Sequence, residues 1–335
     1  MCSVLASVRG DLTAQDITHL RFLSMFVVLL GGLSAGYLAS NRFGLSEQLA
    51  RKVMTVVLLA LNWPIGLFII WQMKLTARLF WLPVIAVVLL LIVTFLCKIL
   101  FVFHNLDEKS RMTLILAGAL SNLGYTGGMF VCYALFGQTG LGLSQIYLML
   151  WVPVVYLTFL PRLRVFELQM KHIKKPGFSV RSMLDYRMLV VPAIIVAIVL
   201  NLSGIKRPRF ISRFYVVDIF VYVASLLSFF AIGLRITFER LKHYIPLYFS
   251  LAAVKFLLTP FVAALLLGLL DLTGRGLGPM VKSVVMVQST CPTAVAMVMM
   301  SNVFDLDSRL GSALWVVNTA VFAVLVVPVL FIVFT

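Results

Sequence analysis

Long apolar runs recur along almost the whole chain, and they restrict the folds that the chain can adopt. In windows of about 19 residues, apolar runs lie near 19–40, 53–73, 79–103, 112–136, 142–161, 188–203, 214–235, 244–270, 281–304 and 310–333. Runs of about 20 apolar residues are long enough to cross a bilayer as helices, which satisfy their backbone polar groups internally. The runs therefore predict an all-α polytopic membrane protein with about ten transmembrane helices.

The small share of charged residues predicts the same class of protein. Only 12% of the 335 residues are charged and 62% are hydrophobic, whereas about a quarter of a soluble domain is charged. The net charge of +16 does not indicate nucleic-acid binding, because the basic residues fall in short connections between apolar runs. We expect the lipid bilayer, and no nucleic acid, as a partner.

A basic loop divides the expected helices into two sets of five. The loop covers 162–187, between a first five-helix repeat at 19–161 and a second at 188–335, and residues 1–18 form an N-terminal extension. Because five is odd, two such repeats enter the membrane from opposite sides, as in inverted-repeat transporters. About 17 of the 28 Lys and Arg residues lie on the side of the basic loop, which predicts a cytoplasmic loop and both termini outside.

Two of the apolar runs are interrupted in the middle by polar residues, glycine and proline. Residues 121–128 read Ser-Asn-Leu-Gly-Tyr-Thr-Gly-Gly, and residues 288–294 read Gln-Ser-Thr-Cys-Pro-Thr-Ala. Paired interruptions in two halves point to the binding site of a secondary transporter. Another interpretation of the first run is helix packing through a small face formed by Gly124 and Gly128. The candidate substrate-binding residues in the two runs are Asn122, Gly124, Gly127, Gly128, Gln288, Ser289, Thr290, Pro292 and Thr293.

Four polar side chains in other apolar runs are further candidates. Lys255 is a countercharge for an anionic substrate, a group that titrates during ion or proton coupling, or a lysine whose long stem snorkels to the membrane surface. Asp218 is an ion-coupling or proton-coupling residue, or a solvated residue at a helix end. Asn62 contacts substrate or packs helices together, and Asn318 is a weaker candidate.

No motif in the sequence predicts catalysis or a metal centre. Residues 32–36 match the Gly-x-Ser-x-Gly pattern of hydrolases, but that pattern needs a strand, a turn and a helix. Here it lies in an apolar run, where Gly32 and Gly36 form a small face for helix packing. The four histidines and four cysteines show no metal-ligand spacing. We expect a protein that is not an enzyme and has no cofactor.

The motifs in the apolar runs resemble those of the auxin efflux carrier family, whose fold is similar to that of bile acid sodium symporters. The matching positions are Gly36-Tyr37, Pro64, Asn122-x-Gly124-Tyr125-x-Gly127, Gly233, Lys255 with Pro260, Cys291-Pro292-Thr293-Ala294 and Asn302-Val303-Phe304-Asp305. The chain departs from the family at Met129, where a proline usually follows the glycine motif. It also lacks the long central loop of some plant members, as bacterial members do.

The resemblance implies a carrier with broken, crossing helices four and nine. Helices one, two, six and seven would form a scaffold, and the others would form a moving transport domain. Substrate would bind at the crossing, where the N-terminal ends of half-helices favour a carboxylate. We therefore expect a secondary active or potential-driven transporter of a small organic anion, auxin-like or another carboxylate, in a bacterial inner membrane.

Several properties of the expected carrier stay open. Coupling to Na+, coupling to H+ and uniport are equal contenders, and the sequence does not choose between export and import or between a monomer and a homodimer. A different class of function is a receptor that has a transporter fold and binds its ligand without moving it.

Overall fold

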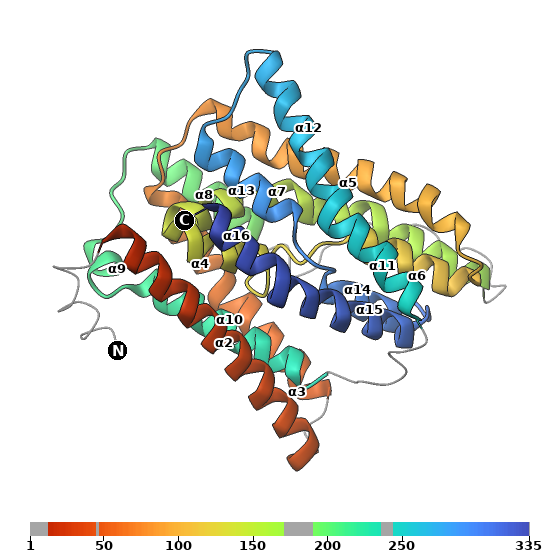
Figure 1. Cartoon of the computed structure of the whole chain (residues 1–335). Coiled ribbons are helices and arrows are strands. Elements are labelled where there is room, and N and C mark those ends of the chain that lie inside the picture. Colours follow the sequence, from red (N-terminus) through yellow and green to blue (C-terminus); the bar gives the residue numbers. More distant parts are fainter. Residues whose placement is uncertain (1–12, 45–46, 171–189, 236–243, 335) are drawn as a thin grey trace.

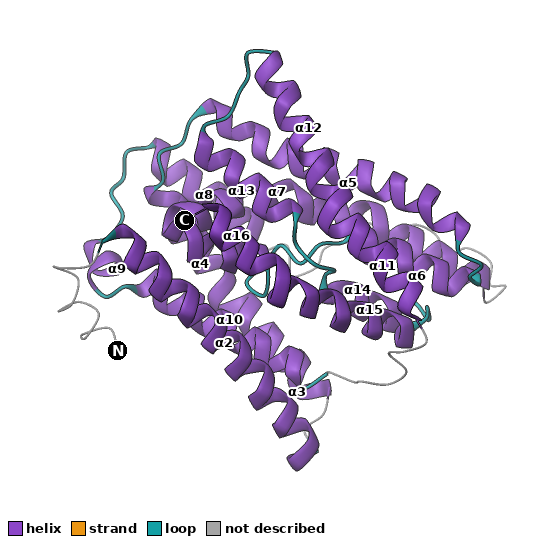
Figure 2. Ribbon diagram, viewed as in Figure 1, coloured by secondary structure: helices purple, strands orange, loops and turns teal. Residues whose placement is uncertain are grey.

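The computed structural model describes residues 13–44, 47–170, 190–235 and 244–334, which fold largely into helices (Figures 1 and 2). In chain order the helices are α2 (Ala14–Phe43), α3 (Glu47–Val56), η1 (Val57–Asn62), α4 (Trp63–Gln72), η2 (Ala77–Phe80), α5 (Trp81–Leu100), η3 (Phe101–Phe103), α6 (Glu108–Ala119), α7 (Gly128–Met170), α8 (Val190–Leu202), α9 (Arg209–Arg213), α10 (Val216–Gly233), α11 (Ile245–Ala253), η7 (Val254–Leu258), α12 (Thr259–Leu272), α13 (Pro279–Ser289), α14 (Val295–Val303), α15 (Ser308–Val321), η8 (Phe322–Val326) and α16 (Val327–Phe334). Within the described residues, seven helical stretches are long and apolar enough to cross a membrane.

This architecture confirms the prediction of an all-α polytopic membrane protein. Each expected apolar run overlaps one or more helices, and the two interrupted runs appear as the pairs α6 with α7 and α13 with α14. Pairing of the two halves as an inverted repeat stays a prediction. Most of the expected N-terminal extension, and residues 171–187 of the basic loop, lie outside the described residues.

The long helix α7 consists of two helical segments that are joined at a sharp turn. Gly137 has φ +62° and ψ −149°, a positive φ that glycine adopts without a steric penalty. Beyond the turn, Gln145 Nε2 donates a hydrogen bond to the hydroxyl of Tyr125, 2.6 Å away. In a straight helix, Gln145 would lie about 25 Å from Gly128. The chain therefore reverses at Gly137, between the segments 128–136 and 138–170.

Three of the helical stretches contain a wider, π-helical turn that ends two residues before a proline. The turns are η1, η7 and η8, and the prolines are Pro64, Pro260 and Pro328. Proline has no N–H group, and its ring clashes with the carbonyl four residues earlier, which a π turn relieves. Thr259, the residue after η7, donates its Oγ1 to the carbonyl oxygen of Val254, the first residue of the turn, at 2.7 Å. Two prolines inside α7, Pro153 and Pro161, have no such turn.

The helices pack as two groups. The first group contains α2, α3, η1, α4, α8, α9 and α10, in which α2 lies along α10 and α4 lies along α8 (Figure 1). The second group contains α5, α6, α7 and α11 to α16, and α7 packs there against α5 and α13. Because α7 also contacts α2 and α4, it forms part of the boundary between the groups. These groups consist of the spans named above for the scaffold and the transport domain.

Glycines bring α2 and α10 close together. A Cβ atom at Gly36 would lie 3.0 Å from the Cα of Gly233, and a Cβ at Gly32 would lie 2.8 Å from the Cβ of Phe229. The face expected from Gly32 and Gly36 is therefore a helix contact, and residues 32–36 lie inside α2 as predicted.

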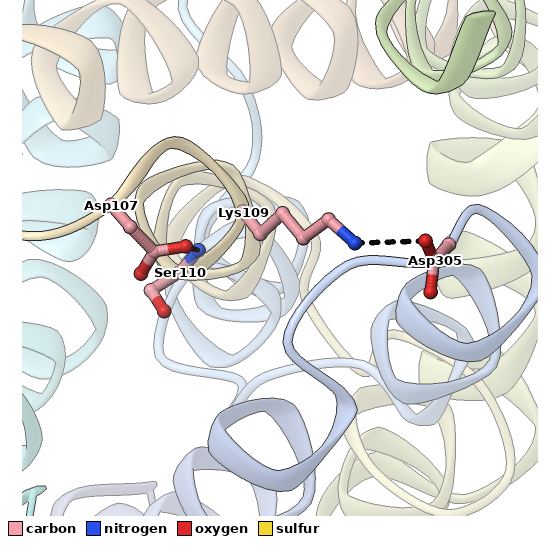
Figure 3. A network of polar contacts seen from close by, with 4 residues as sticks. All are labelled: Asp107, Lys109, Ser110 and Asp305. Atoms are coloured by element: carbon pink, nitrogen blue, oxygen red, sulfur yellow. Dashed lines mark hydrogen bonds and ion pairs between the residues drawn. The ribbon is translucent and has the colours of Figure 1, made fainter. Parts of the chain in front are cut away.

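Polar contacts join the start of α6 to the loop between α14 and α15, and Figure 3 shows one of them, between Lys109 and Asp305. Asp107 caps α6, and hydrogen bonds from Ser110 lower the pKa of its carboxyl. The hydroxyl of Ser110 donates to Asp307, which caps α15, at 2.9 Å. Lys109 Nζ lies 2.8 Å from a carboxylate oxygen of Asp305. These contacts place the loop before α6 beside the loop before α15.

Candidate functional site

The two interrupted runs of the sequence contact each other at their interruptions. The first crossing segment, 120–127, connects α6 to α7, and the second, 290–294, connects α13 to α14; both are loops among the helices (Figure 2). Ser121 of the first and Thr293 of the second form an antiparallel bridge. The structure therefore places a crossing of two non-helical segments at the two interrupted runs, as the family resemblance implies.

Backbone hydrogen bonds join the two crossing segments. The N–H of Asn122 donates to the carbonyl of Pro292 at 2.7 Å, and the N–H of Ala294 donates to the carbonyl of Leu120 at 2.9 Å. A backbone group that is freed from a helix costs several kcal/mol in hydrocarbon unless it finds another partner. Each segment supplies such partners to the other, which offsets the cost of breaking both helices.

The side chain of Asn122 shapes its own segment. Its Nδ2 donates to the carbonyl of Thr126 at 3.0 Å, and its Oδ1 accepts a hydrogen bond from the hydroxyl of Thr126 at 2.9 Å. The residue is 7% exposed. In this conformation Asn122 therefore holds the loop in shape, and a direct contact with substrate would require it to exchange these partners.

The three glycines of the first crossing segment and the start of α7 differ in their surroundings. A Cβ atom at Gly127 would overlap the carbonyl of Asn122, and one at Gly128 would overlap the side chain of Gln288. At Gly124 a Cβ would meet no atom within 4 Å. Gly124 also lies outside any helix. Packing through a helical face of Gly124 and Gly128 is therefore wrong for this structure.

Most polar side chains of the second crossing segment and of the adjoining end of α13 already have partners. The hydroxyls of Ser289 and Thr290 donate to carbonyls in the last turn of α13, at 2.7 and 2.9 Å. The N–H of Thr293 donates a hydrogen bond to Oδ1 of Asn318 at 2.8 Å. The hydroxyl of Thr293 donates to a carbonyl of α6 at 2.9 Å. Gln288 is 1% exposed, and its Nε2 has no partner among the described residues.

Lys255 faces the crossing. It lies in η7, is 0% exposed, and its Nζ donates to the hydroxyl of Ser121 at 2.9 Å. The side chain therefore points into the protein and does not snorkel. No acidic side chain in the described part of the chain forms an ion pair with it. A charged lysine in such surroundings is costly unless a partner balances it.

The space at the crossing is small in this conformation. A cavity of about 20 Å³ is lined by Ser121, Tyr147, Trp151, Thr259, Gln288 and neighbouring apolar residues. That volume is of the order of one water molecule, whereas pockets for organic ligands measure about 300–1,000 Å³. The crossing is therefore closed to an organic ligand in this structure.

A larger hollow is lined by none of the residues of the two crossing segments. It measures about 760 Å³, lies between the end of α5 and α11, η7 and α12, and is lined largely by apolar side chains. Its polar residues, His104 and Ser250, are joined by a hydrogen bond of 2.9 Å. We do not assign the substrate to it, because it lacks the charged and backbone groups that gather at the crossing.

Two of the predicted site residues lie elsewhere. Asp218, in the first turn of α10, accepts hydrogen bonds from the hydroxyl of Tyr133 at 2.6 Å and from Nε2 of Gln138 at 2.9 Å. It is half-buried and belongs to a separate polar cluster. Asn62 lies in η1, which packs against α10, and its Oδ1 has no partner among the described residues.

Sequence reasoning missed several polar residues that the structure brings into these two sites. They are Ser121, which pairs with Lys255, Thr126, which pairs with Asn122, and the two donors to Asp218, Tyr133 and Gln138. A glutamine directly after Gly137, between two apolar runs, was an available signal for a tight polar turn.

A comparison with models of known protein families gives a match. The model of a family described as membrane transport protein matches residues 22–331, well over half of the chain. No curated protein matches the chain. Among the described residues, no group of three or more His, Cys, Asp or Glu side chains has the arrangement of a metal site.

Proposed function

This chain belongs to the membrane transport protein family, which is the auxin efflux carrier family, and we propose that it carries a small organic anion across the membrane by alternating access. The family is one of transporters and not of enzymes. The observation that carries the choice of an anion is Lys255, buried against the crossing without an acidic partner among the described residues.

The ends of the half-helices support the same choice. The N-termini of α7 and α14 follow directly after the two crossing segments, so their positive dipole ends lie beside the crossing. The C-termini of α6 and α13 also lie there and contribute partial negative charge. A carboxylate is therefore favoured next to the N-termini, and Lys255, which contacts Ser121, adds a positive charge at the crossing.

The closed cavity supports alternating access. A site of about 20 Å³ cannot admit an organic anion, so the helices that enclose it must move before substrate binds. The division into two packing groups supplies the parts for such a motion, because the crossing lies wholly within the second group. Movement of that group past the first would open the crossing to one side at a time.

The test is thermal stabilisation of the purified protein by a panel of monocarboxylates, dicarboxylates and indole acids, with and without Na+ and at two pH values. A ligand at 100 times its dissociation constant stabilises the folded protein by about 2.7 kcal/mol, which raises the melting temperature measurably. We expect a carboxylate to stabilise the wild type, and we expect Lys255→Met, which keeps the apolar stem, to lose that shift.

Lys98→Met is the matched control, because Lys98 is an exposed lysine on α5 and should leave the shift unchanged. An anion-dependent shift that survives in Lys255→Met would remove Lys255 from the site. If only neutral or cationic compounds stabilise the protein, the anion proposal is wrong. A ligand that stabilises the protein but does not move into vesicles would favour the receptor alternative.

A further inference from the structure

A second cluster of polar side chains joins the two helix groups at some distance from the crossing. From the first group, Asp218 of α10 provides both carboxylate oxygens. From the second group, Tyr133 of α7 donates its hydroxyl to one oxygen at 2.6 Å, and Gln138 donates its Nε2 to the other at 2.9 Å. Both hydrogen bonds cross the boundary between the groups.

Aromatic and cationic side chains of the first group enclose Tyr133. The ring of Tyr222 on α10 packs edge to face against the ring of Tyr133, with centroids 5.8 Å apart. The guanidinium of Arg21 on α2 lies 5.8 Å from the centroid of the same ring. Ser24 of α2 and Tyr222 share a hydrogen bond of 2.6 Å within the first group. Tyr133 therefore fits into a surface that α2 and α10 build together.

A short helical segment connects this cluster to the crossing. The segment 128–136 begins at the first crossing segment and ends at the turn of Gly137. Tyr133 is five residues from Gly128, which is about 7.5 Å along a helix. Gln138 follows Gly137 directly, and a Cβ atom on Gly137 would lie 2.8 Å from the guanidinium of Arg21. A displacement of the crossing relative to the first group would thus carry Tyr133 and Gln138 away from Asp218.

We propose that Asp218 is a positioning residue for transport, whose hydrogen bonds with Tyr133 and Gln138 hold the two helix groups in the arrangement seen here. Both bonds break when the second group moves to expose the crossing on the opposite side of the membrane. The proposal rests on the proposed alternating access, but it does not depend on the chemistry of the substrate. Asp218 acts on the conformation, at a place where it touches neither Lys255 nor the crossing segments.

The first experiment reads the conformation without any substrate. Gly124→Cys is the reporter, because a side chain at this position meets no atom within 4 Å. Labelling by a membrane-impermeant maleimide is measured in sealed vesicles of both orientations. The wild-type protein has glycine at this position, so its labelling measures the background from the native cysteines. The ratio of the two labelling rates reports which side reaches the crossing.

Asp218→Ala removes both hydrogen bonds across the boundary, and Tyr133→Phe removes one. A hydrogen bond to a charged group is strong enough that its loss should shift the ratio of labelling rates by about tenfold in Asp218→Ala, with a smaller shift in Tyr133→Phe. Ser24→Ala, which loses hydrogen bonds to Arg21 and Tyr222 that both lie within the first group, should leave the ratio unchanged. An unchanged ratio in a folded Asp218→Ala protein would overturn the proposal.

The second experiment holds the two groups together. The double variant Gln138→Cys/Asp218→Cys is treated with a short bifunctional maleimide. Uptake of a panel of labelled carboxylates is then compared before and after treatment. Cross-linking should abolish uptake. The control is Lys109→Cys with Asp305→Cys, whose side chains also touch but belong to one group, so that its cross-link should leave uptake intact.

The two experiments separate the failure of this inference from the failure of the proposed function. If the labelling ratio shifts but no carboxylate is taken up by any form of the protein, Asp218 sets the conformation and the substrate class is wrong. If carboxylates are transported and the cross-linked pair transports as well as the control, transport does not need the separation of Asp218 from Gln138, and the inference is wrong.

Discussion

At the scale of single residues, Gly128 and Lys255 are closely packed at the crossing. Gly128 lies against the side chain of Gln288, and Lys255 is enclosed with only the hydroxyl of Ser121 as its hydrogen-bond partner among the described residues. Gly124, four residues before Gly128, faces open space. Two glycines of the same motif therefore differ in what a side chain would meet.

This difference predicts opposite outcomes for the same substitution. Gly128→Ala forces a Cβ into the side chain of Gln288 and should destabilise the protein by about 1–3 kcal/mol, with loss of uptake. Gly124→Ala should stay within about 0.5 kcal/mol of the wild type. Melting temperatures of the two purified variants test the pair, and equal melting temperatures would contradict this account of the crossing.

The sequence allowed some of these residues to be predicted and hid others. Lys255 was identifiable because a charge in the middle of an apolar run is rare. Its partner Ser121 is 134 positions away, and no local pattern connects the two. The role of Asn122 was also hidden, because its bonds to Thr126 depend on the shape of the loop and not on the residue type.

At the scale of elements, the π turns determine which way side chains point. A π turn adds a residue to the helix, so the residues on either side of it are rotated relative to a regular α-helix. Lys255 lies inside η7, two residues after Ala253 and five before Pro260. The direction of Lys255 towards Ser121 therefore depends on the proline that the turn precedes.

Pro260→Ala should let η7 relax towards a regular α-helix. The change would rotate Lys255 away from Ser121, and we expect a loss of uptake and of carboxylate-dependent stabilisation at normal membrane abundance. Pro328→Ala removes the matching proline after η8, which carries no charged residue, and should retain both activities. Equal uptake in the two variants would show that η7 does not orient the lysine.

Elements were easier to predict than the contacts between them. Glycine and proline interrupted two apolar runs, so both breaks were visible, and the break before α7 forms even though Met129 replaces the usual proline. The antiparallel bridge was not visible, because it joins segments from opposite halves of the chain. The π turns also left no signal beyond the prolines themselves.

At the scale of the whole molecule, loops that were expected on one side of the membrane do meet one another. Lys109, after the third span, pairs with Asp305, after the ninth. At the other end, Asn201 of α8 donates to the carbonyl of Met73 after α4 at 2.8 Å, and Arg275 lies 5.4 Å from the ring centroid of Trp81. The contacts agree with spans that alternate in direction, and the side that faces the cytoplasm stays a prediction.

Labelling of two exposed loop positions tests that orientation. Thr76→Cys lies in the loop after α4, and Asn105→Cys lies in the loop before α6. The excess of basic residues on the side of the central loop predicts that the loop with Thr76 lies outside and the loop with Asn105 lies in the cytoplasm. An impermeant maleimide added to intact cells should therefore label Thr76→Cys only. Asn105→Cys should react after the membrane is permeabilised. The reverse pattern would invert the proposed orientation.

The bridge between Ser121 and Thr293 also has a consequence for biosynthesis. The ribosome makes the first crossing segment long before the second, and at about 5–20 residues per second the interval is roughly 10–30 s. During that time the N–H of Asn122 and the carbonyl of Leu120 lack the partners that they have in the finished protein. The nascent first half must therefore wait in the membrane with its middle unpaired, in contact with water, the insertion machinery or a chaperone, until the second half arrives.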